Sequence, residues 1–223
     1  GNGAHSQRQL DVYGEVILAA DVYVASGGTL EPVECRMLAG FGKVVCNQWR
    51  KPDHGIWETR GEPKQYTFSK LMCWVALDRL LKLNQKGIVS LGLLANQFCR
   101  QRDAIAATIE ELGFNPGVAS YVSELNGSAI DASLLLMPCV GYKSANDPRV
   151  MATYERTWQR LGRNGLLYRY EPADNQLGSR EGAFGICSFW AAHHLACRPD
   201  MQQARKVFDR RSAISRRPLA MLD

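Results

Sequence analysis

The sequence lacks the long apolar runs that would place it in a membrane. Its longest ones, such as residues 133–140, are far shorter than the roughly 20 residues that a membrane-spanning helix requires. The N-terminus also lacks a basic segment followed by an apolar one, the pattern of a secretory signal. From these two absences we expect no membrane partner and a cytoplasmic location.

The cysteines show none of the spacings that indicate a zinc site or a disulfide framework. There are seven of them, no two form a C-x-x-C pair, and no cluster of cysteine and histidine has metal-ligand spacing along the chain. Most lie among apolar residues of expected helices, where reduced and buried thiols are the simplest explanation. The sequence therefore predicts no metal site.

A net charge of +5 is the only compositional hint of a nucleic-acid partner. The excess is local to residues 204–217, where basic residues outnumber a single acid and Phe208 is the only aromatic residue. A solvated helix face explains this segment better than a base-stacking surface, and we expect no nucleic-acid partner. A glycine-rich phosphate loop and a recognisable nucleophile elbow or triad are also missing from the sequence.

What the sequence does contain is helical periodicity from end to end, which predicts an all-α fold of about eight helices. The segment 68–84 carries apolar residues on more than one stripe, as expected for a helix packed on two sides. Short extended pieces are expected at 118–122 and 166–170, without a convincing sheet. The expected helices span residues 8–26, 31–50, 68–84, 93–112, 130–137, 147–161, 182–196 and 200–214.

No linker-like segment interrupts the chain, so residues 1–223 are expected to form one domain or part of one. The hydrophobic content of 46% supports a sizeable core. Long loops alternate with tight ones along the chain. In an array of paired helices this alternation places the long loops on one face, where functional sites are usually built.

The loop HGIWETRGEP at residues 54–63 separates two expected helices and carries a candidate catalytic acid, Glu58. An apolar surround raises the pKa of a carboxylic acid and so suits it to donate a proton near neutral pH. Trp57 supplies such apolar surface and a face on which a sugar ring can stack, whereas Arg60 would stabilise the ionised form. The residues alone favour a loop glutamate paired with Arg60 over a catalytic one.

Two further residues lie in the segment 168–190. Arg169 stands between two tyrosines, a setting in which a guanidinium can bind hydroxyl or carboxylate groups, although an ion pair with Glu171 explains it as well. Glu181 stands at the start of an expected helix, where the helix dipole alone favours a carboxylate.

Six blocks of the sequence carry a family resemblance. The longest is PDHGIWETRGEPKQYTFSKLMCWVALDRLLKL at residues 52–83. The others are QLDVYGEV (9–16), DASLLLMPCVGY (131–142), NDPRV (146–150), GLLYRY (165–170) and EGAFGICSFW (181–190). Together they cover nearly the whole chain in order and resemble glycoside hydrolase family 15, the glucoamylases and their bacterial trehalase-like relatives. The amino-acid sequence of the longest block is more similar to the trehalase-like branch than to the starch-degrading enzymes.

This resemblance implies a fold and a chemistry. The family fold is an (α/α)₆ barrel of six inner and six outer helices, with the sugar pocket formed by loops at one end; the chain would be an incomplete barrel. The family hydrolyses α-glucosidic bonds with inversion and needs no cofactor. One carboxylic acid protonates the leaving oxygen, and a second carboxylate activates water. The implied partner is an α-glucoside or oligosaccharide substrate.

The resemblance also implies roles for individual residues. Glu58 matches the general acid, Trp57 and Arg60 match pocket residues, and Arg169 and Glu181 match residues that bind sugar hydroxyls. Asp223 falls at or near the position of the general base, but an aspartate is one methylene shorter than the glutamate of the family pattern.

Two departures from the family pattern leave two hypotheses. The first is that the Arg-Asp pair that binds the terminal glucose in the family has no counterpart here. The second is that a barrel with about eight of its twelve helices would expose apolar surfaces, which self-association or a partner chain would cover. The first hypothesis is a hydrolase of trehalose or maltooligosaccharides, with little or no activity in the isolated chain. The alternative is a non-catalytic helical remnant that binds a glycan or a protein.

Overall fold

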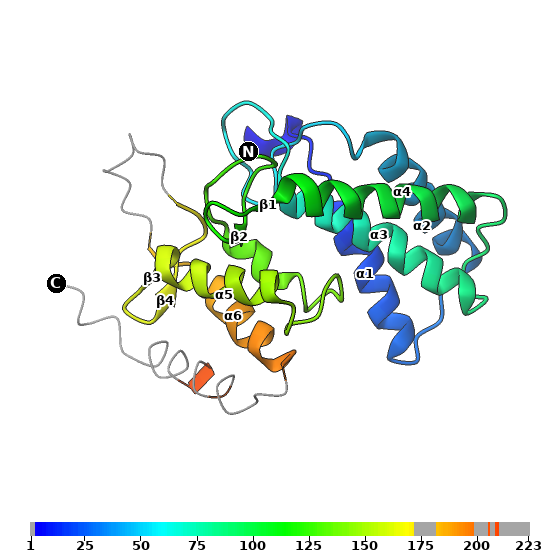
Figure 1. Ribbon diagram of the computed structural model, residues 1–223. Coiled ribbons are helices and arrows are strands. Elements are labelled where there is room, and N and C mark those ends of the chain that lie inside the picture. The colour runs from blue at the N-terminus through cyan, green and yellow to red at the C-terminus, as the bar shows by residue number, and fades with distance from the viewer. Residues whose placement is uncertain (1–2, 172–181, 199–204, 206–207, 210–223) are drawn as a thin grey trace. The chain divides into compact units, whose positions relative to one another are not determined.

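A computed structural model describes residues 3–171, 182–198, 205 and 208–209. The chain divides into two compact units (Figure 1). Unit 1 comprises Gly1–Gly113 and Glu124–Asn126, and unit 2 comprises Phe114–Ser123 and Gly127–Asp223. Each unit is described below by itself.

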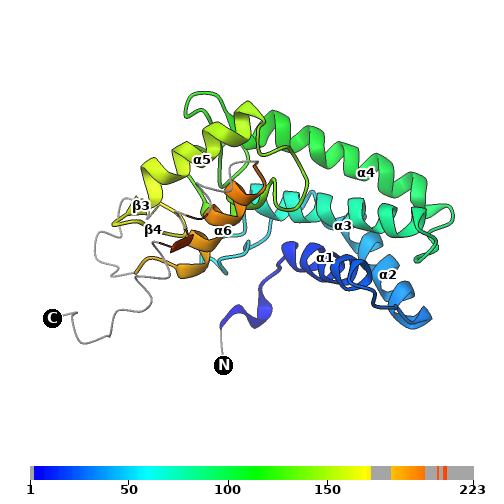
Figure 2. The same ribbon diagram turned by 90° about the horizontal axis from the view of Figure 1, so that it is seen from below.

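Unit 1 is built around one central helix, α3, which lies between α1 and α4 (Figures 1 and 2). Residues on every side of α3 are buried, which confirms the prediction of a helix packed on two sides. The elements of unit 1 are η1 (Gly3–Ser6), α1 (Asp11–Ala25), α2 (Pro32–Gln48), α3 (Thr67–Gln85), α4 (Leu94–Thr108) and the π-helical turn η2 (Ile109–Gly113).

Glycine allows α1 and α3 to approach closely. A Cβ atom on Gly14 would lie 2.2 Å from the carbonyl oxygen of Met72, so any side chain at this position would push the two helices apart. Gly42 of α2 serves the same purpose, because a Cβ atom there would lie 2.6 Å from the ring of Phe98. Both contacts bring helix backbones and large side chains together in the dense core of unit 1.

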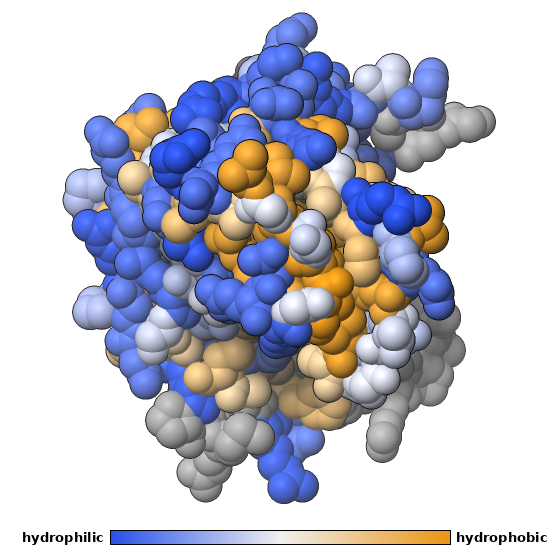
Figure 3. Space-filling model, turned by 90° about the vertical axis from the view of Figure 1, so that its right-hand side faces the viewer, coloured by the Kyte–Doolittle hydropathy of each residue, from blue (hydrophilic) through white to orange (hydrophobic). Residues whose placement is uncertain are grey.

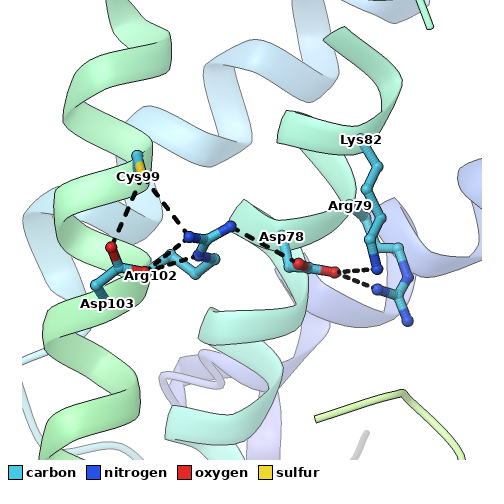
Figure 4. A network of polar contacts seen from close by, with 6 residues as sticks. All are labelled: Asp78, Arg79, Lys82, Cys99, Arg102 and Asp103. Atoms are coloured by element: carbon cyan, nitrogen blue, oxygen red, sulfur yellow. Dashed lines mark hydrogen bonds and ion pairs between the residues drawn. The ribbon is translucent and has the colours of Figure 1, made fainter. Parts of the chain in front are cut away.

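The C-terminal half of α3 carries a network of charged side chains (Figure 4). The buried carboxylate of Asp78 pairs with Arg79, with Lys82 at 2.8 Å and with Arg102 of α4 at 3.9 Å. Arg79, itself nearly buried, also reaches Asp21 of α1 at 3.3 Å. The network therefore connects α3 to the helices on both sides of it.

Asp11, the first residue of α1, is buried in unit 1, and burial raises its pKa from 3.8 to about 6. The nearby Asp53 raises it further, while hydrogen bonds from backbone amides oppose the shift. Between pH 4 and 6 the folded chain binds more protons than the unfolded chain. Stability is therefore lost as the pH rises through this window, since ionised Asp11 is held away from water and near another carboxylate.

We expect Asp11→Asn to remove this loss of stability. Two pKa units correspond to about 3 kcal/mol, so the variant should gain about 1–3 kcal/mol in the free energy of unfolding at pH 7 relative to the parent chain. Urea unfolding measured from pH 4 to pH 7 tests this, with the exposed Glu111→Gln as the control. An unchanged pH dependence in Asp11→Asn would show that another group is responsible.

Unit 2 combines helices with two short antiparallel hairpins. Its elements are β1 (Phe114–Asn115) paired with β2 (Ser120–Tyr121), the 3₁₀-helix η3 (Ala132–Leu136), α5 (Pro148–Leu161), β3 (Gly162–Arg163) paired with β4 (Leu166–Leu167), and α6 (Gly185–Ala196). The side chain of Asp147 caps α5 by accepting hydrogen bonds from the amides of Arg149 and Val150, and Pro148 occupies the first turn.

The packing of α6 on η3 is fixed by a buried histidine. Nδ1 of His194 donates to the carbonyl oxygen of Leu135 at 2.9 Å, because a carbonyl can only accept. Burial lowers the pKa of His194 from 6.5 to about 4, so the ring is neutral at physiological pH. On the same helix, the hydroxyl of Ser188 accepts from the amide of Leu167 at 3.0 Å and ties α6 to β4.

The prediction of a mainly helical protein is confirmed, with differences in two segments. Residues 130–137 form a 3₁₀-helix over Ala132–Leu136 instead of an α-helix. Met137 keeps right-handed α angles and its amide bonds to the carbonyl of Leu134, three residues back, at 3.3 Å. Pro138 has no amide proton, so the bond to Leu134 that an α-helix would make from this position is missing. The expected helix 200–214 lies outside the described residues except for 205 and 208–209. In the described part of the chain six α-helices are present.

Unit 1 exposes apolar side chains on two neighbouring helices. They are Val12, Val16, Val22 and Tyr23 of α1 and Val33 and Met37 of α2. Figure 3 shows hydrophobic surface among hydrophilic residues on the side of the molecule where α1 to α4 are labelled in Figure 1. Self-association or a covering chain remains a prediction for this surface. Within the described residues, none of the helices is both long and apolar enough to cross a membrane.

Candidate active site

The base of the loop that carries Glu58 is closed by backbone pairing. The amide and carbonyl of Asp53 each bond to Lys64, at 2.9 and 2.8 Å. The fully buried carboxylate of Asp53 accepts from the amide of Leu10 at 3.0 Å and from the hydroxyl of Ser69 at 2.7 Å. One aspartate therefore ties the loop to the start of α1 and to the first turn of α3.

A buried lysine supports the same region. Lys70 is fully buried and donates from Nζ to the carbonyl oxygen of Lys51 at 3.0 Å. Burial lowers its pKa, and the nearby Cys73 and Asp53 oppose that effect. Asp53 therefore provides part of the negative charge that a buried ammonium group needs.

The tip of the loop is held by side chains from two other segments. Nε2 of Gln7 donates to the carbonyl oxygens of Glu58 at 3.4 Å and Thr59 at 3.0 Å. The hydroxyl of Thr59 donates to the carbonyl of His54 at 3.0 Å and lies 2.9 Å from the hydroxyl of Tyr66. Burial raises the pKa of Tyr66. The loop is thus fixed at its tip as well as at its base.

Glu58 has an uncommon backbone conformation. Its φ is +49°, in the left-handed region that non-glycine residues rarely adopt, and its amide donates to the carbonyl of Gly55 at 3.2 Å. Gly55 also has a positive φ, of +65°, and a Cβ atom there would lie 2.9 Å from the ring of Tyr66. This tight turn leaves the side chain of Glu58 exposed next to the half-buried Trp57 and the exposed Arg60.

Arg169 belongs to unit 2 and lies among aromatic rings, as the sequence indicated. Its guanidinium carbon is 5.4 Å from the ring centroid of Tyr170 and 5.3 Å from that of Phe184. The carboxylate of Glu171 pairs with Arg160. It also accepts from the amide of Ile130 at 3.2 Å. These cation–π contacts help to hold the half-buried guanidinium, whose N–H groups can bind hydroxyl groups.

Two predicted site residues, Glu181 and Asp223, lie outside the described residues. Sequence reasoning, in turn, missed two residues that position Glu58. Asp53 and Gln7 are separated from their partners by many residues, and the signal for them is weak: an acid just before a glycine-bounded loop, and a glutamine just before α1.

Unit 1 thus carries Glu58 on an anchored loop, and unit 2 carries Arg169 beside two aromatic rings. The model of the glycosyl hydrolases family 15 matches residues 1–215, and the chain belongs to this family.

Among curated proteins, the chain is similar to trehalases. It is 35% identical over 216 residues to the trehalase of Mycolicibacterium smegmatis, covering 94% of this chain and 31% of that protein. It is 32% identical over 211 residues to the trehalase of Thermoplasma volcanium, covering 94% of this chain and 33% of that protein. The chain therefore spans about a third of the length of these relatives.

Solved structures show the same fold. A wild-type glycosidase superposes with a TM-score of 0.72 at 18% identity, covering 90% of this chain and 52% of that one. A glycosidase variant in complex with glucose gives 0.73 at 17% identity, covering 91% and 53%. The predicted fold class is confirmed: the chain has the fold of part of an (α/α)₆ glycosidase barrel.

Proposed function

We propose that this chain is part of an inverting α-glucoside hydrolase of the trehalase type. Membership of the glycosyl hydrolases family 15 and the similarity to trehalases over 94% of the chain support this activity. A sugar substrate is further supported by the glucose bound to a glycosidase of the same fold. Units 1 and 2 would then be two parts of one catalytic domain.

The loop around Glu58 is the observation that carries the proposal. A general acid must hold its proton in a fixed position relative to the leaving oxygen, and this loop is anchored at both base and tip. The left-handed conformation of Glu58 is costly for a non-glycine residue, and such conformations occur often at active sites. Glu58 is an exposed residue, so a substrate can approach it.

Each proposed site residue has a chemical role. Glu58 protonates the glycosidic oxygen as the bond to the anomeric carbon breaks. The ring of Trp57 offers an apolar face to a sugar ring, and Arg60 lines the pocket. Arg169 and Glu181 bind sugar hydroxyls. A second carboxylate takes a proton from the attacking water, at roughly 6.5–9.5 Å from the acid in inverting enzymes, and Asp223 is the candidate for this base.

The product of hydrolysis tests this function. We expect the protein expressed from its complete reading frame to hydrolyse trehalose faster than maltose or maltooligosaccharides, and the 223-residue chain in parallel to show little or no hydrolysis. Proton NMR of the first products should show β-glucose appearing with each bond cleaved, because water attacks the face opposite the leaving group.

Two results would contradict the proposal. Initial release of α-glucose alone would indicate retention and exclude the single-displacement mechanism. Binding of trehalose without hydrolysis by the protein from the complete reading frame would favour the alternative, a non-catalytic helical protein that binds a glycan.

A further inference from the structure

Unit 2 brings together three potential metal ligands that are far apart in the sequence. The sulfur atoms of Cys139 and Cys197 and a ring nitrogen of His193 all lie within 4.8 Å of one another. All the cysteines are free thiols, and Cys197 and His193 are exposed while Cys139 is half-buried. This Cys139–His193–Cys197 cluster plays no part in the proposed hydrolysis.

The fold places these side chains through two rigid supports. His193 and Cys197 are four residues apart at the C-terminal end of α6, so they lie on the same face of the helix. The amide of Cys197 donates to the carbonyl of His193 at 3.0 Å, which keeps this last turn closed. Cys139 lies in the turn after η3, and the His194–Leu135 hydrogen bond holds η3 against α6.

The spacing of the two sulfur atoms matches a tetrahedral zinc site. Two thiolates that bind zinc, each at about 2.3 Å and at the tetrahedral angle, have sulfur atoms about 3.8 Å apart. The sulfur atoms of Cys139 and Cys197 are 3.8 Å apart. A disulfide would require them to approach to about 2.05 Å. The geometry is therefore closer to that of two metal ligands than to that of a disulfide.

The histidine completes a donor set that zinc prefers. A thiolate and an imidazole on the same zinc ion are about 3.6 Å apart, and the exposed His193 needs only a small side-chain rotation to close the remaining gap within 4.8 Å. Two thiolates and one neutral imidazole carry a charge of −2, which neutralises a divalent cation. Soft thiolate ligands also favour zinc over magnesium or calcium.

We propose that Cys139, His193 and Cys197 form a zinc-binding site with one position open for water. The ion would join the turn after η3 to the end of α6, two segments separated by more than fifty residues. Because binding requires the folded arrangement of all three ligands, zinc should stabilise unit 2, and the gain should rise with the logarithm of the zinc concentration above Kd. The site does not depend on the proposed glycosidase activity.

Zinc titration of the reduced, metal-free 223-residue chain tests the site. We expect calorimetry to show one zinc ion bound per chain and the thermal midpoint to rise on zinc addition. Cobalt added as a spectroscopic probe should give a thiolate-to-cobalt charge-transfer band in the near ultraviolet. Both Cys197→Ser and His193→Ala change exposed side chains, so the variants should fold, and each should weaken zinc binding at least about tenfold.

Cys35→Ser is the matched control, because Cys35 is a half-buried free thiol in unit 1 outside the cluster. Its zinc affinity should equal that of the parent chain. Equal zinc affinity in the parent and in Cys197→Ser would overturn the proposal. So would a reduced chain that binds no zinc and forms a Cys139–Cys197 disulfide on mild oxidation, since the pair would then be a redox-sensitive dithiol.

Discussion

Replacing Glu58 with glutamine is expected to lower kcat for α-glucoside hydrolysis by about 10²–10⁴-fold, the usual contribution of a general acid. Glutamine has the shape of glutamate and can still bond to the glycosidic oxygen, but it has no proton that can be transferred to the leaving group. KM should therefore change little. Steady-state kinetics of the protein from the complete reading frame, with trehalose as substrate, would measure both constants.

The same loop contains the control for this variant. Glu62 is four residues away, exposed, and has no proposed role, so Glu62→Gln should keep kcat within about twofold of the parent. A sugar with a good leaving group, such as a nitrophenyl glucoside, needs little protonation and should be cleaved by Glu58→Gln with a smaller loss. Undiminished trehalose hydrolysis by Glu58→Gln would exclude Glu58 as the acid.

Replacing Asp78 with alanine is expected to lower the free energy of unfolding by about 3–5 kcal/mol, as for other broken buried ion pairs. Asp78 is 7% exposed, and its removal takes one carboxylate partner from the nearly buried Arg79, while Asp21 remains at 3.3 Å. Lys82 and Arg102 lose the same partner. Urea denaturation followed by far-ultraviolet circular dichroism would measure the change, because the affected helices make up most of unit 1.

Asp103 provides a control within the same network (Figure 4). Its side chain is 61% exposed and pairs with Arg102 at 2.8 Å, so solvent screens the pair. Asp103→Ala should cost less than about 1 kcal/mol. An equal loss of unfolding free energy in Asp78→Ala and Asp103→Ala would contradict this prediction. It would mean that water stabilises the charges around α3 despite their burial.

The helices could be predicted from the sequence because their pattern is local. Apolar residues at helical spacing located α1 to α6 to within a few residues. The prediction was wrong where a neighbouring feature overrode the pattern: the pattern at 130–137 extends up to Pro138, and the backbone forms a 3₁₀-helix instead. The family resemblance drew attention to Glu58, which the residues alone left as a salt-bridged loop acid.

The support around Glu58 could not be predicted, because it depends on contacts between distant segments. The hydrogen bonds of Gln7 to the loop span about fifty residues, and those of Asp53 join the starts of two helices. The Cys139–His193–Cys197 cluster was missed for the same reason: only the four-residue interval between His193 and Cys197 is visible in the sequence. Spacing along the chain cannot show that η3 brings Cys139 to them.

The buried carboxylate of Asp53 also determines how the loop takes part in unfolding. It bonds both to the start of α1 and to the first turn of α3, so the loop cannot detach at its base without leaving the amide of Leu10 and the hydroxyl of Ser69 without this acceptor. Segments that open independently of the fold, such as substrate lids, have few such buried contacts. The loop of Glu58 is therefore part of the same cooperative unit as these helices, and the candidate acid keeps its position for as long as unit 1 stays folded.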